Sequence, residues 1–201
     1  MDEKECDPLE LLTRVFKRLP SIGPKSAQRL SLFILRAPDD YVRAFSQALE
    51  RARTRTRLCS LCCDYTEEEL CPICSDPRRN KKTVCVVEQP TDLRAIEKTN
   101  EYNGMYHVLH GALSPLNAVS PADLKIKELV DRVKKGGIEE IIIATNADTE
   151  GDVTASYLME ELKGLGLKIT RIGTGMPAGG ELEYTDPITL TRALSNRKVI
   201  D

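Results

Sequence analysis

Two pairs of cysteines in the middle of the chain constrain its fold more than any other feature. Cys59 and Cys62 form one Cys-x2-Cys pair, and Cys71 and Cys74 form a second, with eight residues between the two pairs. Two such pairs converge naturally on one tetrahedral ion, and four thiolates predict a closed, structural Zn2+ site without an open catalytic position. The segment around them is too short to build its own hydrophobic core, so its folding is expected to depend on the metal.

One neighbouring cysteine leaves the ligand set open. Cys63 directly follows Cys62 and could compete with it for the metal, although only Cys62 keeps the two-residue spacing. The alternative to a zinc site is a set of four unrelated buried thiols. The chain has seven cysteines, an odd number, and its first residues form no apolar signal segment. We therefore expect a cytoplasmic protein with a metal module rather than a disulfide framework, and no membrane segment.

Charge is distributed unevenly along the 201 residues. Residues 11–57 carry eleven Lys and Arg and three acids, a net charge of +8, whereas residues 83–201 carry 13 basic and 18 acidic residues, a net charge of −5. This asymmetry predicts a polyanion-binding N-terminal part joined to an acidic part with another role; the alternative is a solvated basic face that binds nothing. With three Phe, six Tyr and no Trp, a surface that stacks on successive bases of a single strand is not expected.

The basic part has the apolar spacing and the helix-start residues of three helices. They are expected to begin at Pro8, at Pro24 (ending near Leu35) and near Asp39. The third helix is expected to turn three apolar residues inward: Val42, Phe45 and Leu49.

A tight turn over residues 19–24 joins the first two of these helices. Gly23 is expected to allow a backbone conformation that a Cβ would penalise. The helix that follows begins with free N–H groups that suit a phosphate; Lys25 lies at that end, with Arg29 and Arg36 on the same face. The combination resembles the helix-hairpin-helix motif, which grips the nucleic-acid backbone without reading bases. An ordinary helical corner with solvated charges is the alternative, and backbone contacts would make DNA binding strongly salt dependent.

After residue 80 the pattern changes to strands that alternate with helices. The expected strands are 83–87, 106–109, 139–145 and 167–172, and the expected helices are 93–98, 123–135 and 154–164. Such alternation indicates βαβ units and a parallel sheet. The predicted fold is therefore a mixed α+β and α/β chain of several modules, with a helical N-terminal region, a small zinc module and a C-terminal parallel sheet flanked by helices.

Acidic residues follow two of the expected strands. Glu88 comes directly after 83–87, and Asp148, Glu150 and Asp152 come soon after 139–145. Because functional crevices of parallel α/β sheets lie at the carboxyl ends of the strands, we expect these four carboxylates to lie near one another. An oxygen-lined site of this kind suits Mg2+. Helix N-capping by Asp148 or Asp152 in a solvated loop is the alternative.

The acidic cluster resembles that of the Toprim domain, in which a Glu after the first strand and an Asp-x-Asp after a later strand hold Mg2+. In this chain Asn146 stands where that family has the first Asp of the pair. A neutral amide coordinates Mg2+ more weakly than a carboxylate. The resemblance therefore leaves Mg2+ binding open and argues against phosphoryl transfer.

The order of the modules resembles the RecR family of bacterial recombination mediators over nearly the whole chain. Beside the four cysteines, three motifs carry the likeness: residues 19–29, 106–115 and 171–186. After the third strand this family typically has Asn-x-x-x-Glu-Gly-Glu. Asn146 and Glu150 agree with that pattern, Asp152 is a conservative replacement, and Asp148 is an added acid.

The resemblance implies a protein that is not an enzyme: a ring-shaped oligomer, usually a homotetramer, that clamps DNA. Such proteins act with RecO and RecF to load recombinase onto gapped or single-stranded DNA. By analogy, Lys25 and Arg29 face the interior of the ring, and Glu88, Glu150 and Asp152 lie on a docking surface for partner proteins.

The resemblance also implies a division of the chain and a location in the cell. The regions are 1–56 for the helix-hairpin-helix, 57–80 for the zinc module, 81–175 for the Toprim domain and 176–201 for a C-terminal tail that makes oligomer contacts. The protein is expected in the bacterial cytoplasm, associated with the nucleoid. The alternative function is a Mg2+-dependent Toprim enzyme, a nuclease or a primase-like protein.

Overall fold

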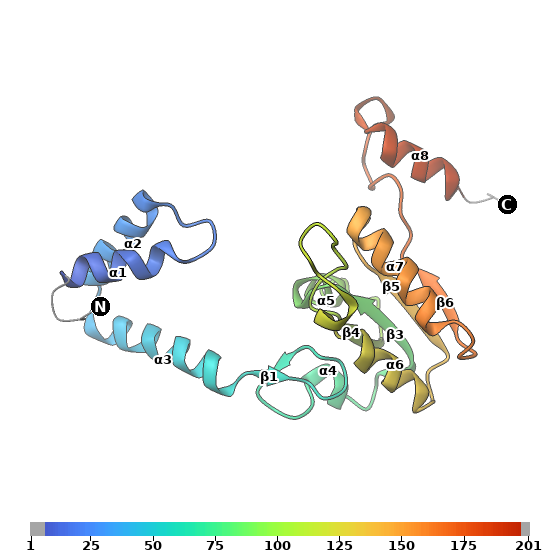
Figure 1. Cartoon of the computed structure of the whole chain (residues 1–201), viewed down its shortest axis with the longest axis horizontal. Helices are drawn as coiled ribbons and strands as arrows, with labels where there is room; N and C mark the ends of the chain where they lie inside the picture. The colour runs from blue at the N-terminus through green and yellow to red at the C-terminus, as the bar shows by residue number, and fades with distance from the viewer. Residues whose placement is uncertain (1–6, 198–201) are drawn as a thin grey trace. The chain divides into compact units, whose positions relative to one another are not determined.

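The computed structural model describes residues 7–197, and the chain divides into two compact units after Thr56 (Figure 1). The first unit contains three helices: α1 (Pro8–Lys17), α2 (Pro24–Arg36) and α3 (Asp39–Arg55). The second unit contains the remaining elements: β1 (Arg57–Leu58), β2 (Tyr65–Thr66), α4 (Pro72–Ser75), β3 (Asn80–Val87), α5 (Pro90–Glu97), β4 (Gly104–Val108), η1 (Pro121–Asp123), α6 (Ile126–Lys134), β5 (Glu140–Ala144), α7 (Thr149–Leu162), β6 (Lys168–Arg171), η2 (Leu182–Tyr184) and α8 (Pro187–Ser195).

The three helices of the first unit begin where the sequence predicts. Asp7 caps α1, because its side chain accepts a hydrogen bond from the Leu9 N–H at 3.2 Å. Two small residues of α2, Ala27 and Ser31, are fully buried, and the Thr13 hydroxyl of α1 donates to Ser31 Oγ at 3.0 Å. Small side chains at this contact let α1 and α2 pack closely as a helical hairpin.

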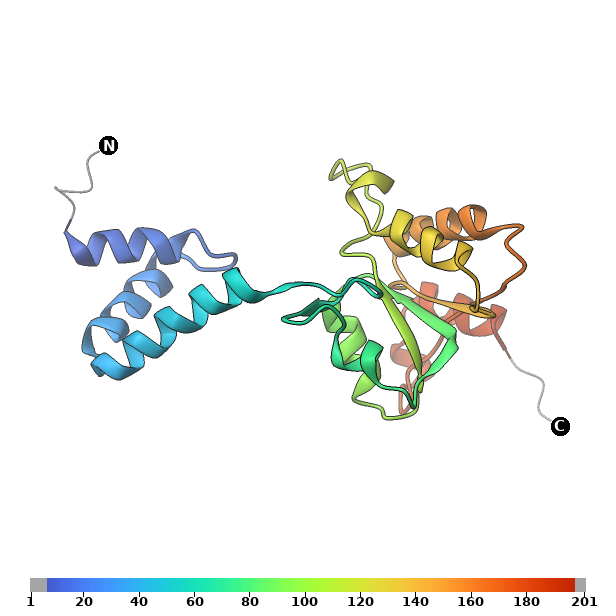
Figure 2. The same cartoon turned by 90° about the horizontal axis from the view of Figure 1, so that it is seen from below.

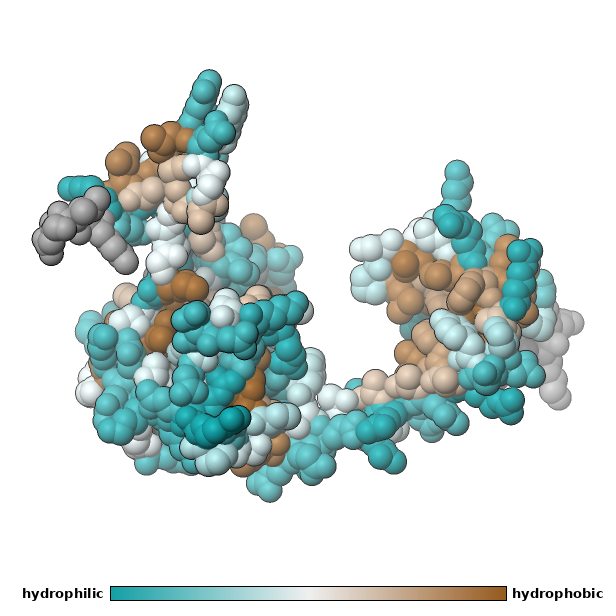
Figure 3. All heavy atoms as spheres, turned by 180° about the vertical axis from the view of Figure 1, so that it is seen from behind, coloured by the Kyte–Doolittle hydropathy of each residue, from teal (hydrophilic) through white to brown (hydrophobic). Residues whose placement is uncertain are grey.

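The sequence predicts that the apolar side of α3 is buried, and this prediction is wrong. No residue of α3 is buried within the described chain, and Phe45 and Leu49 are 40% and 60% exposed. Tyr41 stacks on Phe45 with ring centroids 6.4 Å apart, and Phe33 of α2 contacts Tyr41 edge-on at 5.6 Å. The physical reason is size, since two short helices cannot cover both faces of a third. Figure 3 shows apolar side chains gathered on the surface of this unit.

The second unit is built on a four-stranded sheet that is parallel, as predicted. Its strand order is β4-β3-β5-β6. Helix α5 covers one face, and α6 and α7 cover the other (Figure 2). Residues of β3 alternate between the two faces: Val84 packs with Leu129 and Leu158, whereas Cys85 packs with Leu93. Strand β4 lies on one side of β3, and β5 lies on the other side. The direction in which successive strands are added therefore reverses between β3 and β5. In open α/β sheets this reversal is where binding crevices form.

Helix α7 begins five residues before the predicted start at 154, at Thr149. Asp148 is its N-cap and accepts a hydrogen bond from the Gly151 N–H at 2.7 Å. A Cβ on Gly151 would collide with the backbone carbonyl of Asn146, so glycine lets the strand and the helix approach closely. Two of the predicted acids, Glu150 and Asp152, therefore lie on the first helical turn rather than in a loop.

The cysteine-rich segment packs within the second unit rather than as a separate body. The short strands β1 and β2 pair antiparallel, and α4 follows them. Cys59, Cys62, Cys71 and Cys74 are all buried and belong to the same apolar cluster as β3 residues Val84 and Val86. The segment thus shares its core with the sheet. None of the helices in the described part of the chain combines the length and apolarity needed to cross a membrane.

Candidate functional site

The four cysteines of the two Cys-x2-Cys pairs converge at one point. Their sulfur atoms all lie within 4.8 Å of one another, and Cys62 Sγ is 3.6 Å from Cys71 Sγ. A tetrahedral zinc ion with Zn–S bonds of about 2.3 Å places its sulfurs about 3.8 Å apart. The donor set and its spacing therefore fit a zinc site with four cysteine ligands.

Hydrogen bonds already organise the sulfur atoms. The Cys71 N–H donates to Cys59 Sγ at 3.3 Å. Hydrogen bonding raises the pKa of Cys62, with the larger effect from Cys71 and a smaller one from Cys74. The hydrogen bond to Cys62 lowers the pKa of Cys71. Cysteine ligands bind Zn2+ as thiolates, so Zn2+ binding at this site would release protons.

Cys63 stands outside the ligand group. It is buried, its backbone φ is +62°, and its carbonyl faces the ring of His110, whose Nε2 is 2.6 Å away. The group of possible metal ligands in the described chain includes Cys62 and not Cys63. Burial raises the pKa of Cys63 to about 11, so little of this side chain is in the thiolate form that binds metal.

The helical hairpin exposes the three cations singled out from the sequence. Lys25, Arg29 and Arg36 all lie on α2 with exposed side chains, and none has an ion-pair partner within residues 7–197. Lys25 lies at the N-terminal end of α2, where the helix dipole favours an anion. A row of unpaired cations beside a helix N-terminus can bind successive phosphates.

The conformational argument for Gly23 was wrong. Gly23 is the N-cap of α2 with φ −79° and ψ 170°, an extended conformation open to any residue. The left-handed residue of the turn is Ser21, with φ +63°. A Cβ at Gly23 would meet nothing within 4 Å, so the position is open space in front of the helix N-terminus. What glycine provides here is room beside the free N–H groups.

The carboxylates that follow β3 and β5 each accept hydrogen bonds from a different group. Glu88 is 5% exposed and accepts hydrogen bonds from Asn146 N at 2.8 Å and Asn146 Nδ2 at 2.6 Å. Burial raises the pKa of Glu88, and the hydrogen bonds from Asn146 oppose that rise. Glu150 accepts a short hydrogen bond from the Ser114 hydroxyl. Asp148 caps α7, as the alternative interpretation of this segment proposed.

Asp152 ties the C-terminal segment to the sheet. Its two carboxylate oxygens accept from Arg171 of β6 at 2.5 Å and from Arg192 of α8 at 2.8 Å. That Glu88, Asp148, Glu150 and Asp152 lie near one another in the described chain stays a prediction. No group of three or more metal-ligating side chains other than the four cysteines lies within 4.8 Å there.

The pair formed by Glu88 and Asn146 predicts a stability effect. Replacing Glu88 by Ala removes a buried carboxylate that accepts two hydrogen bonds from the exposed Asn146, which we expect to cost about 1.5–3 kcal/mol in the free energy of unfolding. Urea unfolding followed by circular dichroism measures this. Glu88→Gln keeps one carbonyl acceptor and should lose less. A Glu88→Ala variant as stable as the parent chain would contradict the role of this pair.

Four family models match successive parts of the chain. Residues 9–53 match the RecR helix-hairpin-helix, 56–76 the RecR zinc finger domain with four cysteines, 82–173 the Toprim domain and 175–198 the RecR C-terminal region. The chain belongs to the RecR family. The resemblance inferred from the sequence and the predicted fold class are confirmed, and the RecR domains support a role in DNA recombination or repair.

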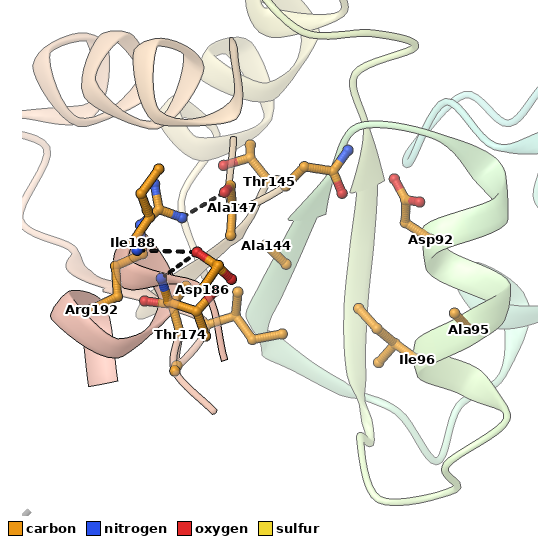
Figure 4. Close-up of a pocket in the computed structure, with 15 residues that line it drawn as sticks. Asp92, Ala95, Ile96, Ala144, Thr145, Ala147, Thr174, Asp186, Ile188 and Arg192 are labelled. Carbon is orange, nitrogen blue, oxygen red and sulfur yellow. Dashed lines mark hydrogen bonds between the residues drawn. The ribbon is translucent and has the colours of Figure 1, made fainter. Parts of the chain in front are cut away.

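A cavity of about 580 Å3 lies where the RecR C-terminal region meets the Toprim domain (Figure 4). Its walls are α5, the end of β5, the loop 172–175 and α8. Arg192 Nη1 donates to the carbonyl of Ala147 at 2.5 Å, and Asp186 caps α8 by accepting from Thr189 N at 2.9 Å. The third RecR motif recognised in the sequence, 171–186, thus forms one side of this cavity.

Several residues that shape these sites carry no local signal in the sequence. Arg94 of α5 makes a two-pronged ion pair with the buried Asp64 beside the cysteines, at 2.8 and 3.2 Å. Arg192 reaches Asp152 across 40 positions of the chain. Their partners become visible only when the RecR domains fold, because each pair joins residues from different elements.

Proposed function

We propose that this RecR-family chain is a DNA-binding mediator of recombinational repair and performs no chemistry on DNA itself. The observation that carries the proposal is the row of exposed cations Lys25, Arg29 and Arg36 on α2, which has no ion-pair partner in the described chain. Such a row can contact phosphates of a nucleic-acid backbone, and phosphate contacts position a protein on DNA without specifying sequence. The domain that contains it matches the RecR helix-hairpin-helix.

Zinc has a structural part in this proposal. The four cysteines Cys59, Cys62, Cys71 and Cys74 would hold one Zn2+ with all four coordination positions filled by thiolates. Such an ion offers no open position to a substrate. It would instead stabilise a segment that has only two-residue strands and a four-residue helix. Mg2+ at the Toprim acids is not needed for this function.

An oligomeric ring is part of the proposal. Apolar side chains of α1, α2 and α3 are exposed, among them Val15, Phe33 and Leu49 at 52%, 54% and 60%. The C-terminal segment adds Leu182 and Ile188 at 69% and 68%. Exposed apolar surface of this extent favours contact with other copies of the chain, and we propose the homotetramer of the RecR family, with DNA held inside the ring.

Partner proteins would dock on the Toprim domain. Of the acids at the strand ends, Asp148 is exposed and Glu150 is half-buried, so these two are open to a basic partner. Asp152 is paired with Arg171 and Arg192, and the buried Glu88 acts within the fold. We propose RecO and RecF as these partners, with recombinase loading on gapped DNA as the outcome. A protein with this role acts in the bacterial cytoplasm at the nucleoid.

A plasmid assay tests the function against the enzyme alternative. The protein is incubated with supercoiled plasmid and Mg2+, and a native gel is run beside a duplicate treated with detergent. We expect a shifted band that detergent returns to intact supercoiled plasmid, because the contacts are to the DNA backbone and no bond is broken. Nicked, relaxed or cut plasmid after detergent would overturn the proposal in favour of a Mg2+-dependent Toprim nuclease.

A further inference from the structure

Arg132 of α6 connects the cysteine segment to the sheet. Its Nη1 donates to the Tyr106 carbonyl of β4 at 2.7 Å and to the Leu61 carbonyl at 3.2 Å. Leu61 lies between Cys59 and Cys62, inside the first Cys-x2-Cys pair. One guanidinium group therefore holds that pair against the sheet, beside the hydrogen bond from Val108 N to the Cys62 carbonyl at 2.8 Å.

The charge of Arg132 has no carboxylate partner. Within residues 7–197 it makes no ion pair, and both of the acceptors that it reaches are neutral carbonyl groups. Arg94, the other guanidinium beside the cysteines, differs because Asp64 neutralises it. A guanidinium stays charged in proteins, so a half-buried one without an acid is stabilised by another negative group nearby.

The cysteines supply that negative group when they bind zinc. Four thiolates and one Zn2+ would carry a net charge of −2, and the Leu61 carbonyl that Arg132 contacts belongs to the residue directly before Cys62. Burial lowers the pKa of Arg132, and the nearby Cys74, Cys62 and Cys59 oppose that effect. The zinc cluster has excess negative charge and Arg132 has positive charge with no other partner.

We propose that Arg132 is a positioning residue of the zinc site, which orients the Cys59–Cys62 pair through Leu61 and balances the negative charge of the tetrathiolate cluster. The inference rests on the proposed zinc site. Partners of metal ligands in the surrounding shell commonly change metal affinity by about 10–100-fold when they are removed. Arg132 would therefore tune how tightly zinc is held without contacting the ion.

The test measures zinc affinity of the full-length chain by competition with a chromophoric chelator. Zinc content of the parent protein is determined first; a parent chain without zinc would refute the proposed site itself. We expect Arg132→Met to lower zinc affinity by about 10–100-fold. Arg132→Lys, which keeps the charge, should recover most of that loss. Lys135→Met removes an exposed cation at the end of the same helix and should stay within about twofold of the parent chain.

Replacing Zn2+ by Co2+ gives a second measurement, the absorption spectrum of the metal site. This spectrum would not change if Arg132 only stabilised the fold. The absorption bands of Co2+ bound by four thiolates are expected to shift in Arg132→Met and to return toward the parent spectrum in Arg132→Lys. Parent-like zinc affinity in Arg132→Met would overturn the inference, and so would a Lys variant as weak as the Met variant. If Arg132→Met does not fold, Arg132→Gln replaces it with the same expected and contrary outcomes.

Discussion

Replacing Cys59 by serine is expected to remove the bound zinc and to destabilise the second unit strongly. A serine hydroxyl is a poor zinc ligand at neutral pH, and three thiolates no longer close the tetrahedron. Binding of structural zinc provides on the order of 10–16 kcal/mol in small zinc-binding peptides, whereas whole domains are stable by only about 5–15 kcal/mol. Because the cysteines share a core with Val84 and Val86 of β3, the loss should extend into the sheet.

Elemental analysis and thermal unfolding together measure this effect. A loss of about 3 kcal/mol corresponds to a midpoint roughly 10 °C lower for a unit of this size. Cys63→Ser is the matched control, since Cys63 is buried beside the site but lies outside the ligand group. It should keep its zinc. Full zinc retention by Cys59→Ser, or equal zinc loss in both variants, would show that the assigned ligand set is wrong.

The double replacement Lys25→Ala with Arg29→Ala is expected to weaken DNA binding and its dependence on salt. Each phosphate contact contributes about 0.9 to the slope of log affinity against log salt concentration, so two lost contacts should lower the slope by about 1.8. At about 0.1 M salt this corresponds to a fall in affinity on the order of 50-fold. Fluorescence anisotropy titrations of labelled duplex DNA over a range of salt concentrations measure both quantities.

A control with the same change in charge separates a specific site from general attraction. Arg43→Ala with Arg53→Ala removes two exposed cations of α3 and leaves the hairpin of α1 and α2 intact. It should lower affinity much less. If both double variants lose the same affinity, DNA is attracted by the net charge of the helical unit, and the assignment of Lys25 and Arg29 as phosphate contacts fails.

Patterns within short stretches of sequence predicted most of the fold. The three helices of the first unit begin at the predicted residues, and the four strands of the parallel sheet lie within a few residues of the predicted runs. Proline at a first helical position and alternating β-branched residues act through neighbours along the chain, so their consequences are visible in sequence. The convergence of the cysteines, which their spacing predicted, is present in the structure.

The errors concern contacts between distant residues. The apolar side of α3 is exposed because the unit holds no fourth element to cover it. The hydrogen bonds from Asn146 to Glu88 and from Arg171 and Arg192 to Asp152 were likewise not predicted. In both cases the residues were identified correctly as apolar or acidic, and the partner was unknown.

The sequence by itself determined the order of the modules, the spacing of the cysteines and the basic face of α2, because these depend on periodicity and spacing along the chain. Only the tertiary structure decided which charges are neutralised and which stay available. Arg192 and Asp152 are far apart in sequence and pair in space, as do Arg94 and Asp64, whereas Arg132 reaches only carbonyl groups. Side-chain partners of this kind are selected by how helices pack on the sheet, and the periodicity of any single segment does not contain that information.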